Sequence, residues 1–313
     1  YIDYLTLAAS YENSCSVDNV TDEQIESMLD RLAKNYDGYC FDEDYEKKVF
    51  STWSVNKFFQ TMVGKKKVQF GEYWYDNGGL PSILVNYLKT HELNIFEYLD
   101  KDKFLKVSSD DFKNPTSLTT INQNVLMCQT GYLTLRSDLN KTSTVALGIP
   151  NGEIYKALNR LLANNIFKGN TDITDDYGRS LLEVGTVDDI INLFNSALNS
   201  VSYDNYPIVS ESSVQNMLKL YLLGAHQKVL SEVHEAKGRA DLVVNTDNRR
   251  IVFEFKYAKN ETEAKSKLLD AVEQIKTRDY GNILPKKNEL IRIAAVFNAD
   301  PKVRAFTENQ IVP

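Results

Sequence analysis

The chain has 313 residues, of which 42% are hydrophobic and 25% are charged, and its formal net charge is −7. This length predicts about two domains, and the composition is that of a globular chain able to bury a sizeable core. No run approaches the ~20 apolar residues of a membrane span. The three cysteines are far apart and odd in number, which argues against a disulfide framework or a thiolate zinc site and favours a reducing, cytoplasmic location.

The charge is unevenly distributed along the chain. Residues 207–313 hold 17 Lys and Arg against 14 Asp and Glu, a net +3, whereas residues 1–206 hold 19 against 29, a net −10. The mildly basic part permits local phosphate binding without demanding it. Turn-rich residues 203–207 lie where this balance changes, so we expect domains at residues 1–206 and 207–313.

The first domain is predicted to be mostly helical. Thr21 and Gln24 form a capping-box pattern ahead of apolar residues at helical spacing, which predicts a helix over residues 22–35. The apolar pattern then predicts two strands around a break over residues 125–135, a strand over residues 144–150, and helices over residues 152–164 and 186–198.

The second domain is predicted to be an α/β unit with the order α-β-β-β-α-β. A helix begins at Ser210 and a strand covers residues 227–234, after which a hairpin supplies two more strands. A helix over residues 261–277 and a final strand over residues 291–297 complete the unit.

The hairpin gathers three charged residues. Residues 238–244 and 251–256 are β-branched or apolar runs on either side of a turn, and counting outward from the turn puts Asp241 directly opposite Glu254. Strand alternation puts Lys256 on the same side as Glu254. Opposed carboxylates repel unless a cation lies between them, and their spacing of roughly 5 Å suits Mg²⁺ or Mn²⁺. The alternative is an exposed strand face with an Asp/Lys salt bridge.

The order Asp, twelve residues, Glu-x-Lys resembles the signature of the PD-(D/E)XK nuclease superfamily, whose core has the same α-β-β-β-α-β order and a restriction-endonuclease-like mixed sheet. The flanking sequences resemble the bacterial branch in which this domain follows an AAA-ATPase-like domain. The residues that carry this second resemblance are Gly238-Arg239-Ala240-Asp241, Phe253-Glu254-Phe255-Lys256, Gln274-Ile275 and Tyr280.

Residues 36–41, 129–133 and 148–151 resemble the C-terminal part of the same AAA-ATPase-like family. The resemblance implies that the phosphate-binding loop lies before Tyr1, and no GxxxxGK[ST] motif occurs in the chain. We therefore expect a fragment or processed product that does not hydrolyse ATP.

The resemblance implies a role for each matching residue. Asp241 and Glu254 would hold Mg²⁺ or Mn²⁺, Lys256 would stabilise or orient the attacking water, and Gln274 would hydrogen-bond near the metal or the substrate. Tyr280 would support the site. For Gln274 and Tyr280 the alternative is ordinary surface hydrogen bonding.

Two further carboxylates are candidates for the same site. Glu232, with Glu235 as its competitor, precedes the hairpin, and the alternative for it is a solvated strand residue. Glu211 opens the first helix of the domain, where an acidic residue also simply suits the helix dipole.

Basic residues could contact substrate phosphates. Arg239 and Lys259 are the first candidates, and the charged helix adds Lys265, Lys267 and Arg278, although a charge run on a helix is usually a solvated face.

The leading functional hypothesis is metal-dependent phosphodiester hydrolysis of nucleic acid, with DNA preferred over RNA by the resemblance alone. The alternative is a catalytically inactive module with the nuclease fold that binds DNA or a protein partner. The sequence gives no indication of the oligomeric state.

Overall fold

The structure is a computed structural model of residues 1–313. It describes residues 1–76, 82–91, 93–114, 117–137, 143–168, 177–225, 227–235, 238–281 and 288–313. The chain divides into two compact units, Tyr1–Leu158 and Asn159–Pro313, and each is described by itself.

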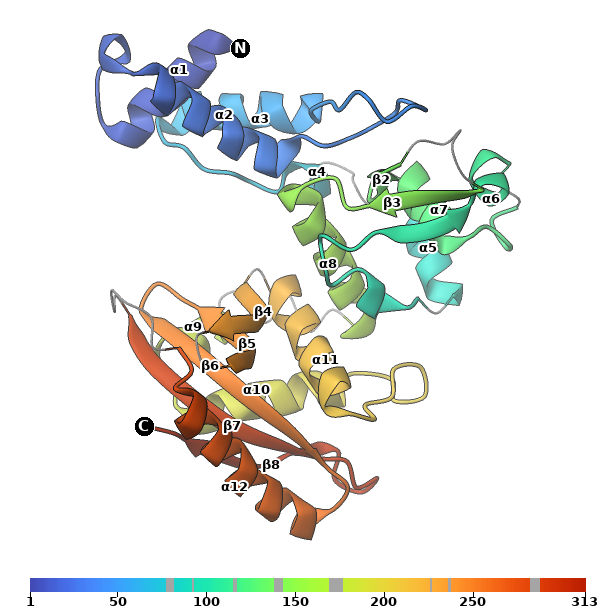
Figure 1. Ribbon diagram of the computed structural model, residues 1–313, viewed down its shortest axis with the longest axis vertical. Helices are drawn as coiled ribbons and strands as arrows, with labels where there is room; N and C mark the ends of the chain where they lie inside the picture. Colours follow the sequence, from blue (N-terminus) through green and yellow to red (C-terminus); the bar gives the residue numbers. More distant parts are fainter. Residues whose placement is uncertain are drawn as a thin grey trace. The chain divides into compact units, whose positions relative to one another are not determined.

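Three helices build the first part of unit 1: α1 (Ile2–Asn13), α2 (Asp22–Tyr36) and α3 (Thr52–Lys65) (Figure 1). They share a cluster of buried side chains that includes Ala8, Met28 and Phe58. The Thr21 hydroxyl accepts the N–H of Gln24, and the Gln24 side chain accepts the N–H of Thr21. This capping box sets the start of α2, so the predicted helix over residues 22–35 is confirmed.

The rest of unit 1 surrounds a three-stranded antiparallel sheet of order β1-β3-β2. Its strands are β1 (Leu105–Ser108), β2 (Thr134–Leu135) and β3 (Thr144–Gly148). The accompanying helices are α4 (Tyr73–Asp76), α5 (Ser82–Thr90), α6 (Ser109–Lys113) and α7 (Gln123–Gln129), with 3₁₀ turns at Val17–Asn19 and Ile95–Glu97. Helix α8 (Gly152–Ile166) spans the division between the two units.

The prediction of two strands over residues 125–135 is wrong in its first half, which belongs to helix α7. The Asn122 side chain caps this helix by accepting the N–H of Asn124 at 2.9 Å. Consecutive buried residues, among them Val125 and Met127, carry no periodicity that separates a buried helix from a strand. The second half is confirmed, because it forms β2 and pairs with β3.

Unit 2 contains a five-stranded sheet of order β4-β5-β6-β7-β8 (Figure 1). The strands are β4 (Lys228–Glu235), β5 (Gly238–Asn245), β6 (Arg249–Ala258), β7 (Glu289–Asn298) and β8 (Ala305–Ile311). Strands β6 and β7 run parallel, and the other neighbours are antiparallel. Helix α12 (Glu261–Arg278) connects the parallel pair. The sheet is therefore mixed, as predicted.

Helices cover both faces of this sheet. Helix α12 packs Ala271 and Ile275 against Val252 of β6. On the other face Phe194 of α10 (Val187–Asn199) packs against Phe253, with ring centroids 5.3 Å apart. Helix α11 (Glu211–Gly224) contacts β4, β5, β6 and α10, and α9 (Tyr177–Val184) contacts α10. Within the described ranges, no helix has the length and apolar character needed to cross a bilayer.

The order α11-β4-β5-β6-α12-β7 confirms the predicted α-β-β-β-α-β arrangement, and β8 is an additional strand. Strand β8 was not predicted, because its sequence is mostly polar and only Phe306 in it is buried. Helix α10 also belongs to unit 2, since the Asn195 side chain bonds both the carbonyl oxygen and the N–H of Phe306. The compact units therefore do not divide at residue 206, and the extent of a nuclease-like domain at residues 207–313 stays a prediction.

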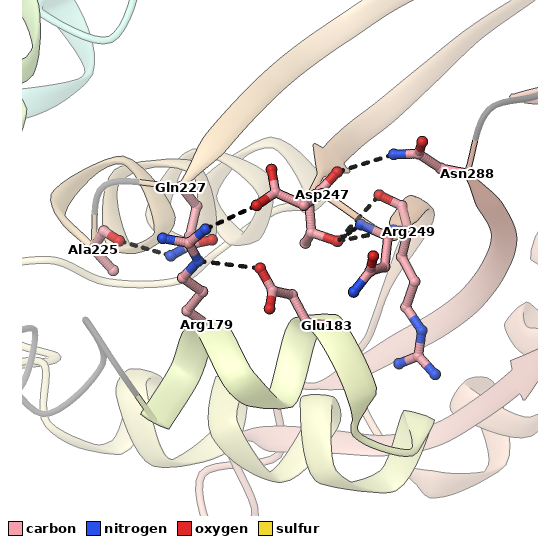
Figure 2. Close-up of polar contacts among 9 residues, drawn as sticks. Arg179, Glu183, Ala225, Gln227, Asp247, Arg249 and Asn288 are labelled. Carbon is pink, nitrogen blue, oxygen red and sulfur yellow. Dashed lines mark hydrogen bonds and ion pairs between the residues drawn. The ribbon is translucent and has the colours of Figure 1, made fainter. Parts of the chain in front are cut away.

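The turn between β5 and β6 is held from two sides (Figure 2). Thr246 Oγ1 accepts the N–H of Arg249 at 2.9 Å within the turn. Asp247 accepts a hydrogen bond from Arg179 of α9 at 3.2 Å, and Asn288 donates to the carbonyl oxygen of Thr246 at 3.0 Å. These contacts fix the turn from which the strand register is counted.

Candidate active site

The register predicted from the turn is confirmed as far as the pair Leu242↔Phe253. Beyond it the regular pairing ends, so Asp241 and Glu254 are not a directly opposed backbone pair as predicted. The Asp241 carboxylate instead accepts the backbone N–H of Phe255 at 2.8 Å. A side chain thus takes the place of a strand-to-strand bond where β5 leaves β6, and this fixes the carboxylate beside Glu254.

The alternation along β6 is as predicted. Phe253 and Phe255 stack on one side with ring centroids 5.5 Å apart. On the other side Lys256 Nζ donates to Glu254 Oε1 at 2.8 Å. The charged pair therefore shares one side of the strand.

Helix α11 brings a third carboxylate to this place. Ser210 caps the helix by accepting the N–H of Ser213, so Glu211 occupies its first turn. Glu211, Asp241 and Glu254 each offer an oxygen atom, and these atoms lie within 4.8 Å of one another. We call these three residues the carboxylate cluster. Ligands lie ~2.0–2.6 Å from Mg²⁺ or Ca²⁺, so two oxygens on one such ion are at most roughly 5 Å apart.

Lys256 lies against the carboxylate cluster. Its ammonium is 2.8 Å from Glu254 Oε1 and 3.4 Å from Glu211 Oε1. The side chain of Lys256 is 14% exposed and that of Glu254 is 0% exposed. The alternative of an exposed strand face with an Asp/Lys salt bridge is therefore wrong, because the lysine pairs with the two glutamates and the strand face is covered.

Burial changes the protonation of Glu254 and Lys256. Desolvation, followed by the charge of Asp241, raises the pKa of Glu254 to about 7, and the hydrogen bond from Lys256 only partly offsets this. Burial by itself would lower the pKa of Lys256, but its hydrogen bond to Glu254 and the surrounding carboxylates outweigh burial and raise that pKa. The lysine thus stays a cation, and Glu254 is poised to gain or lose a proton near neutral pH.

The carboxylate cluster fits a hard divalent cation. Glu254 Oε2 is buried and has no hydrogen-bond partner among the described residues. A buried carboxylate oxygen without a donor is costly, and a cation at that position would satisfy it. The available donor atoms are all carboxylate oxygens, the type preferred by Mg²⁺ and Mn²⁺ over softer metals.

The two residues predicted on the last helix and just after it lie together, but not among the carboxylates. Tyr280 is fully buried in the core between α12 and the sheet. Gln274 Nε2 donates to Tyr280 Oη at 3.3 Å. Neither has a described contact with the carboxylate cluster, so their parts in a reaction stay predictions.

The fourth candidate carboxylate, Glu232, is a residue of strand β4. Glu232 belongs to the stretch of β4 that pairs with β5 beside Asp241. Its side chain, like that of Glu235, lies outside the described residues. A role for Glu232 in the site stays a prediction.

Four of the five basic candidates separate into two groups. Arg239 on β5 and Lys259 just beyond β6 are exposed. Lys265 and Lys267 form ion pairs with glutamates four residues earlier on α12, at 2.6 and 3.1 Å. Those two lysines therefore belong to a charged helix surface, and phosphate contacts by Arg239 and Lys259 stay predictions.

The structure adds Gln215, which was not among the site residues predicted from the sequence. Its side-chain amide donates to the carbonyl oxygen of Asp241, so both the backbone and the side chain of Asp241 are held. Gln215 follows Glu211 by four residues and is 5% exposed. A polar residue at that spacing on an otherwise apolar helix face was a signal that could have identified it.

A protein-family model described as the PD-(D/E)XK nuclease superfamily matches residues 209–307. The match includes the carboxylate cluster and Lys256. Searches of curated proteins and of solved structures gave no match. These comparisons give no support for an AAA-ATPase-like part in residues 1–206, which stays a prediction. Residues 209–307 are a PD-(D/E)XK nuclease superfamily domain.

Proposed function

We propose that this domain hydrolyses phosphodiester bonds of nucleic acid with the help of a divalent metal ion, and that DNA is the substrate. The observation that carries the proposal is the meeting of three carboxylate oxygens within 4.8 Å of one another with the Lys256 ammonium. An acidic cluster alone is common on protein surfaces. Here one member is fully buried, and the lysine beside it is the residue type that the superfamily motif requires.

The chain's own residues have distinct tasks in this proposal. Asp241 and Glu254, with Glu211, would hold the ion, which supplies a Lewis acid for a phosphate oxygen and lowers the pKa of water. Gln215 and the N–H of Phe255 keep the Asp241 carboxylate in place. Lys256, which remains protonated, offers a positive charge to the phosphate as negative charge develops on it.

Cleavage assays with the full chain test the proposal. Incubated with plasmid or single-stranded DNA and Mg²⁺ or Mn²⁺, the wild-type chain is expected to cut. The substitutions Asp241→Asn and Lys256→Met should lower the rate by about 100-fold or more, because each removes a charge from the site. Asp270→Asn is the matched control, since Asp270 is exposed on α12 and its substitution removes the same charge as Asp241→Asn.

Equal residual cleavage in the control and in both site variants would assign the activity to a contaminant and overturn the proposal. Calorimetric titration with Mn²⁺ distinguishes the alternative of an inactive module. Binding of Mn²⁺ and DNA by the wild-type chain without any cleavage would favour a module that keeps the nuclease fold without turnover.

A further inference from the structure

The chain segment after α12 is fixed tightly against the sheet. Asp279 adopts the left-handed conformation with φ of 50° and ends the helix at Arg278. Gly281 has φ of +79°, and a Cβ there would lie 2.6 Å from a leucine side chain of β7. Arg292 of β7 donates to the carbonyl oxygen of Tyr280 at 2.6 Å and pairs with Asp279 at 2.6 Å. The position of Tyr280 is therefore set by its backbone on both sides.

The buried hydroxyl of Tyr280 orients two side chains of α12. Tyr280 is 0% exposed, so its Oη is a polar atom inside an apolar core and needs partners. It accepts a hydrogen bond from Arg278 Nη1 at 2.8 Å and one from Gln274 Nε2 at 3.3 Å. The guanidinium of Arg278 is thus held by a neutral group whose own position is fixed.

Arg278 is unlike the arginines of unit 2 that form ion pairs. Arg179, Arg249 and Arg292 each pair with a carboxylate at 2.6 to 3.2 Å. Arg278 forms no ion pair within the described part of the chain, and its described hydrogen bond uses one of five N–H groups. Its guanidinium keeps donors for a ligand, and their planar fork matches a phosphate.

The carboxylate cluster lies within electrostatic range of this guanidinium. The hydrogen bond to Tyr280 is the largest cause that raises the pKa of Arg278, and the charges of Glu254 and Asp241 act in the same direction. Glu254 points to the side of β6 that α12 covers, since it alternates with Phe253 and shares its side with Val252. Tyr280 packs in the same buried cluster as Val252, and a Cβ on Gly281 would lie 2.8 Å from the Val252 side chain, so the end of α12 that carries Arg278 lies beside the part of β6 that carries Glu254.

The charges of the site leave a place for a second cation. Three carboxylates against the single ammonium of Lys256 leave two negative charges when Glu254 is ionised. A divalent ion balances these two charges, so the site with its ion is neutral. The negative charge of a bound phosphodiester then has no balancing charge among the cluster, Lys256 and the ion. A cation near the cluster but not paired with it meets this need.

We infer that Arg278 binds a phosphate of the nucleic-acid backbone beside the carboxylate cluster, and that Tyr280 is the residue that positions it. This inference rests on the proposed function, because it takes nucleic acid as the ligand. The competing explanation is that Arg278 only stabilises the C-terminal end of α12 through the helix dipole. Lys276 lies in the same last turn and is exposed, so it serves as the matched control.

Fluorescence anisotropy with a labelled DNA oligonucleotide tests the inference on the full chain, with Ca²⁺ in place of Mg²⁺ to suppress cleavage. Arg278→Gln is expected to weaken binding about tenfold, the loss of one charge-assisted hydrogen bond. It should also make the dependence of log affinity on log salt shallower by about 1. Lys276→Gln should change neither quantity, and Mn²⁺ affinity measured by calorimetry should be unchanged in both variants.

Tyr280→Phe tests the positioning role, because it keeps the buried ring and removes only the hydroxyl. It should weaken DNA binding in the wild-type chain and have no additional effect in the Arg278→Gln background. Additive losses in the double variant would overturn the positioning role of Tyr280.

The outcomes separate this inference from the proposed function. If Arg278→Gln and Lys276→Gln behave alike, or the wild-type chain binds no DNA, the phosphate contact is overturned. If the wild-type chain binds DNA without cutting it, and Arg278→Gln still lowers the affinity and its salt dependence, the phosphate contact by Arg278 is supported and hydrolysis as the proposed function is overturned. Cleavage by Arg278→Gln at the wild-type rate and affinity would overturn the contact and leave the proposed function intact.

Discussion

Two glutamates in the described residues are almost completely buried, one in each compact unit. Glu153 is 2% exposed at the start of α8, and Glu254 is 0% exposed on β6. Desolvation by burial is the largest cause in both cases, and it raises the pKa of each carboxyl to about 7. By burial and pKa alone, the two sites would be judged equivalent.

The neighbours of the two carboxyls are different. Glu153 Oε1 accepts the N–H of Trp74 at 2.8 Å, in the first turn of α4. Hydrogen bonds from Ser54 and from the backbone of Trp74 and Tyr73 lower the pKa of Glu153, and Glu72 is its weakest influence. These donors are neutral groups of the fold: Glu153 Oε1 satisfies a backbone N–H at a helix start, while its Oε2, like Glu254 Oε2, has no hydrogen-bond partner among the described residues.

Glu254 has charged neighbours instead, namely Asp241, Glu211 and Lys256. Several anionic oxygens converging beside a buried carboxyl create a demand for a cation that hydrogen-bond donors of the fold do not meet. A perturbed pKa is therefore a guide to a functional site only when the groups that surround it are also considered.

The pH dependence of stability should show what the two glutamates share. Each folded-state pKa of about 7 is above the ordinary value of 4.5. Each carboxyl therefore contributes stability that is fully present below pH 4.5 and is lost as the pH rises through 7, by about 3 kcal/mol per carboxyl. Urea unfolding in EDTA from pH 4 to 8 measures this fall.

Glu153→Gln and Glu254→Gln should each abolish the part of that fall in stability that comes from the substituted carboxyl. In the wild-type chain, saturating Mn²⁺ at pH 8 should restore the stability lost through ionisation of Glu254 but not the stability lost through Glu153, since only Glu254 belongs to the carboxylate cluster. A variant that follows the wild-type curve at every pH would show that its glutamate has an ordinary pKa, and the comparison would break down.

Metal affinity should separate the two glutamates. Glu254→Gln keeps the shape of the side chain and removes an anionic ligand. We expect it to weaken Mn²⁺ binding about 100-fold, which is the upper end of the effect of removing a residue that supports a metal site. Glu153→Gln should leave Mn²⁺ affinity unchanged. Isothermal calorimetry at pH 8, where both carboxyls are ionised in the wild-type chain, gives both values. An equal loss of Mn²⁺ affinity in both variants would mean that the affinity depends on the overall stability of the fold and not on a specific site.

The sequence was sufficient to predict that Asp241, Glu254 and Lys256 lie close together, because a hairpin register and strand alternation are local properties that turn residues specify. Their roles in a reaction stay predictions. It was insufficient for the position of Glu211, which depends on how α11 packs on the sheet. The direct opposition of Asp241 and Glu254 failed for a related reason. Strand β5 leaves β6 at Leu242, and the Asp241 side chain takes over a backbone bond.

Elements without local signals were missed or misassigned. Nothing in the sequence marks Glu153, an acidic residue in the first turn of a helix, as buried, since that place normally suits a solvated acid. Helix α7 was misassigned as a strand because its residues are buried on more than one side. In each case tertiary packing, not the local pattern, decides the outcome.

The smallest effect is expected at Glu211, whose side chain is 42% exposed, whereas that of Glu254 is 0% exposed. Glu211→Gln should weaken Mn²⁺ binding about tenfold, at the low end of the range for a group that supports a metal site, because water can replace an exposed ligand more easily than a buried one. Glu261→Gln is the matched control, since Glu261 has the same first-turn position in α12 that Glu211 has in α11.

Both substitutions remove one favourable charge–dipole interaction of about 0.3–1 kcal/mol at a helix start, and each also removes one ion pair with a lysine, Lys256 for Glu211 and Lys265 for Glu261. Their unfolding free energies in EDTA should therefore fall by similar amounts, and any difference in Mn²⁺ affinity belongs to the site. If calorimetry gives the same Mn²⁺ affinity for both variants, Glu211 is only a helix-start residue. The ion would then be held by Asp241 and Glu254 alone, and Lys256 would pair with Glu211 as part of the fold.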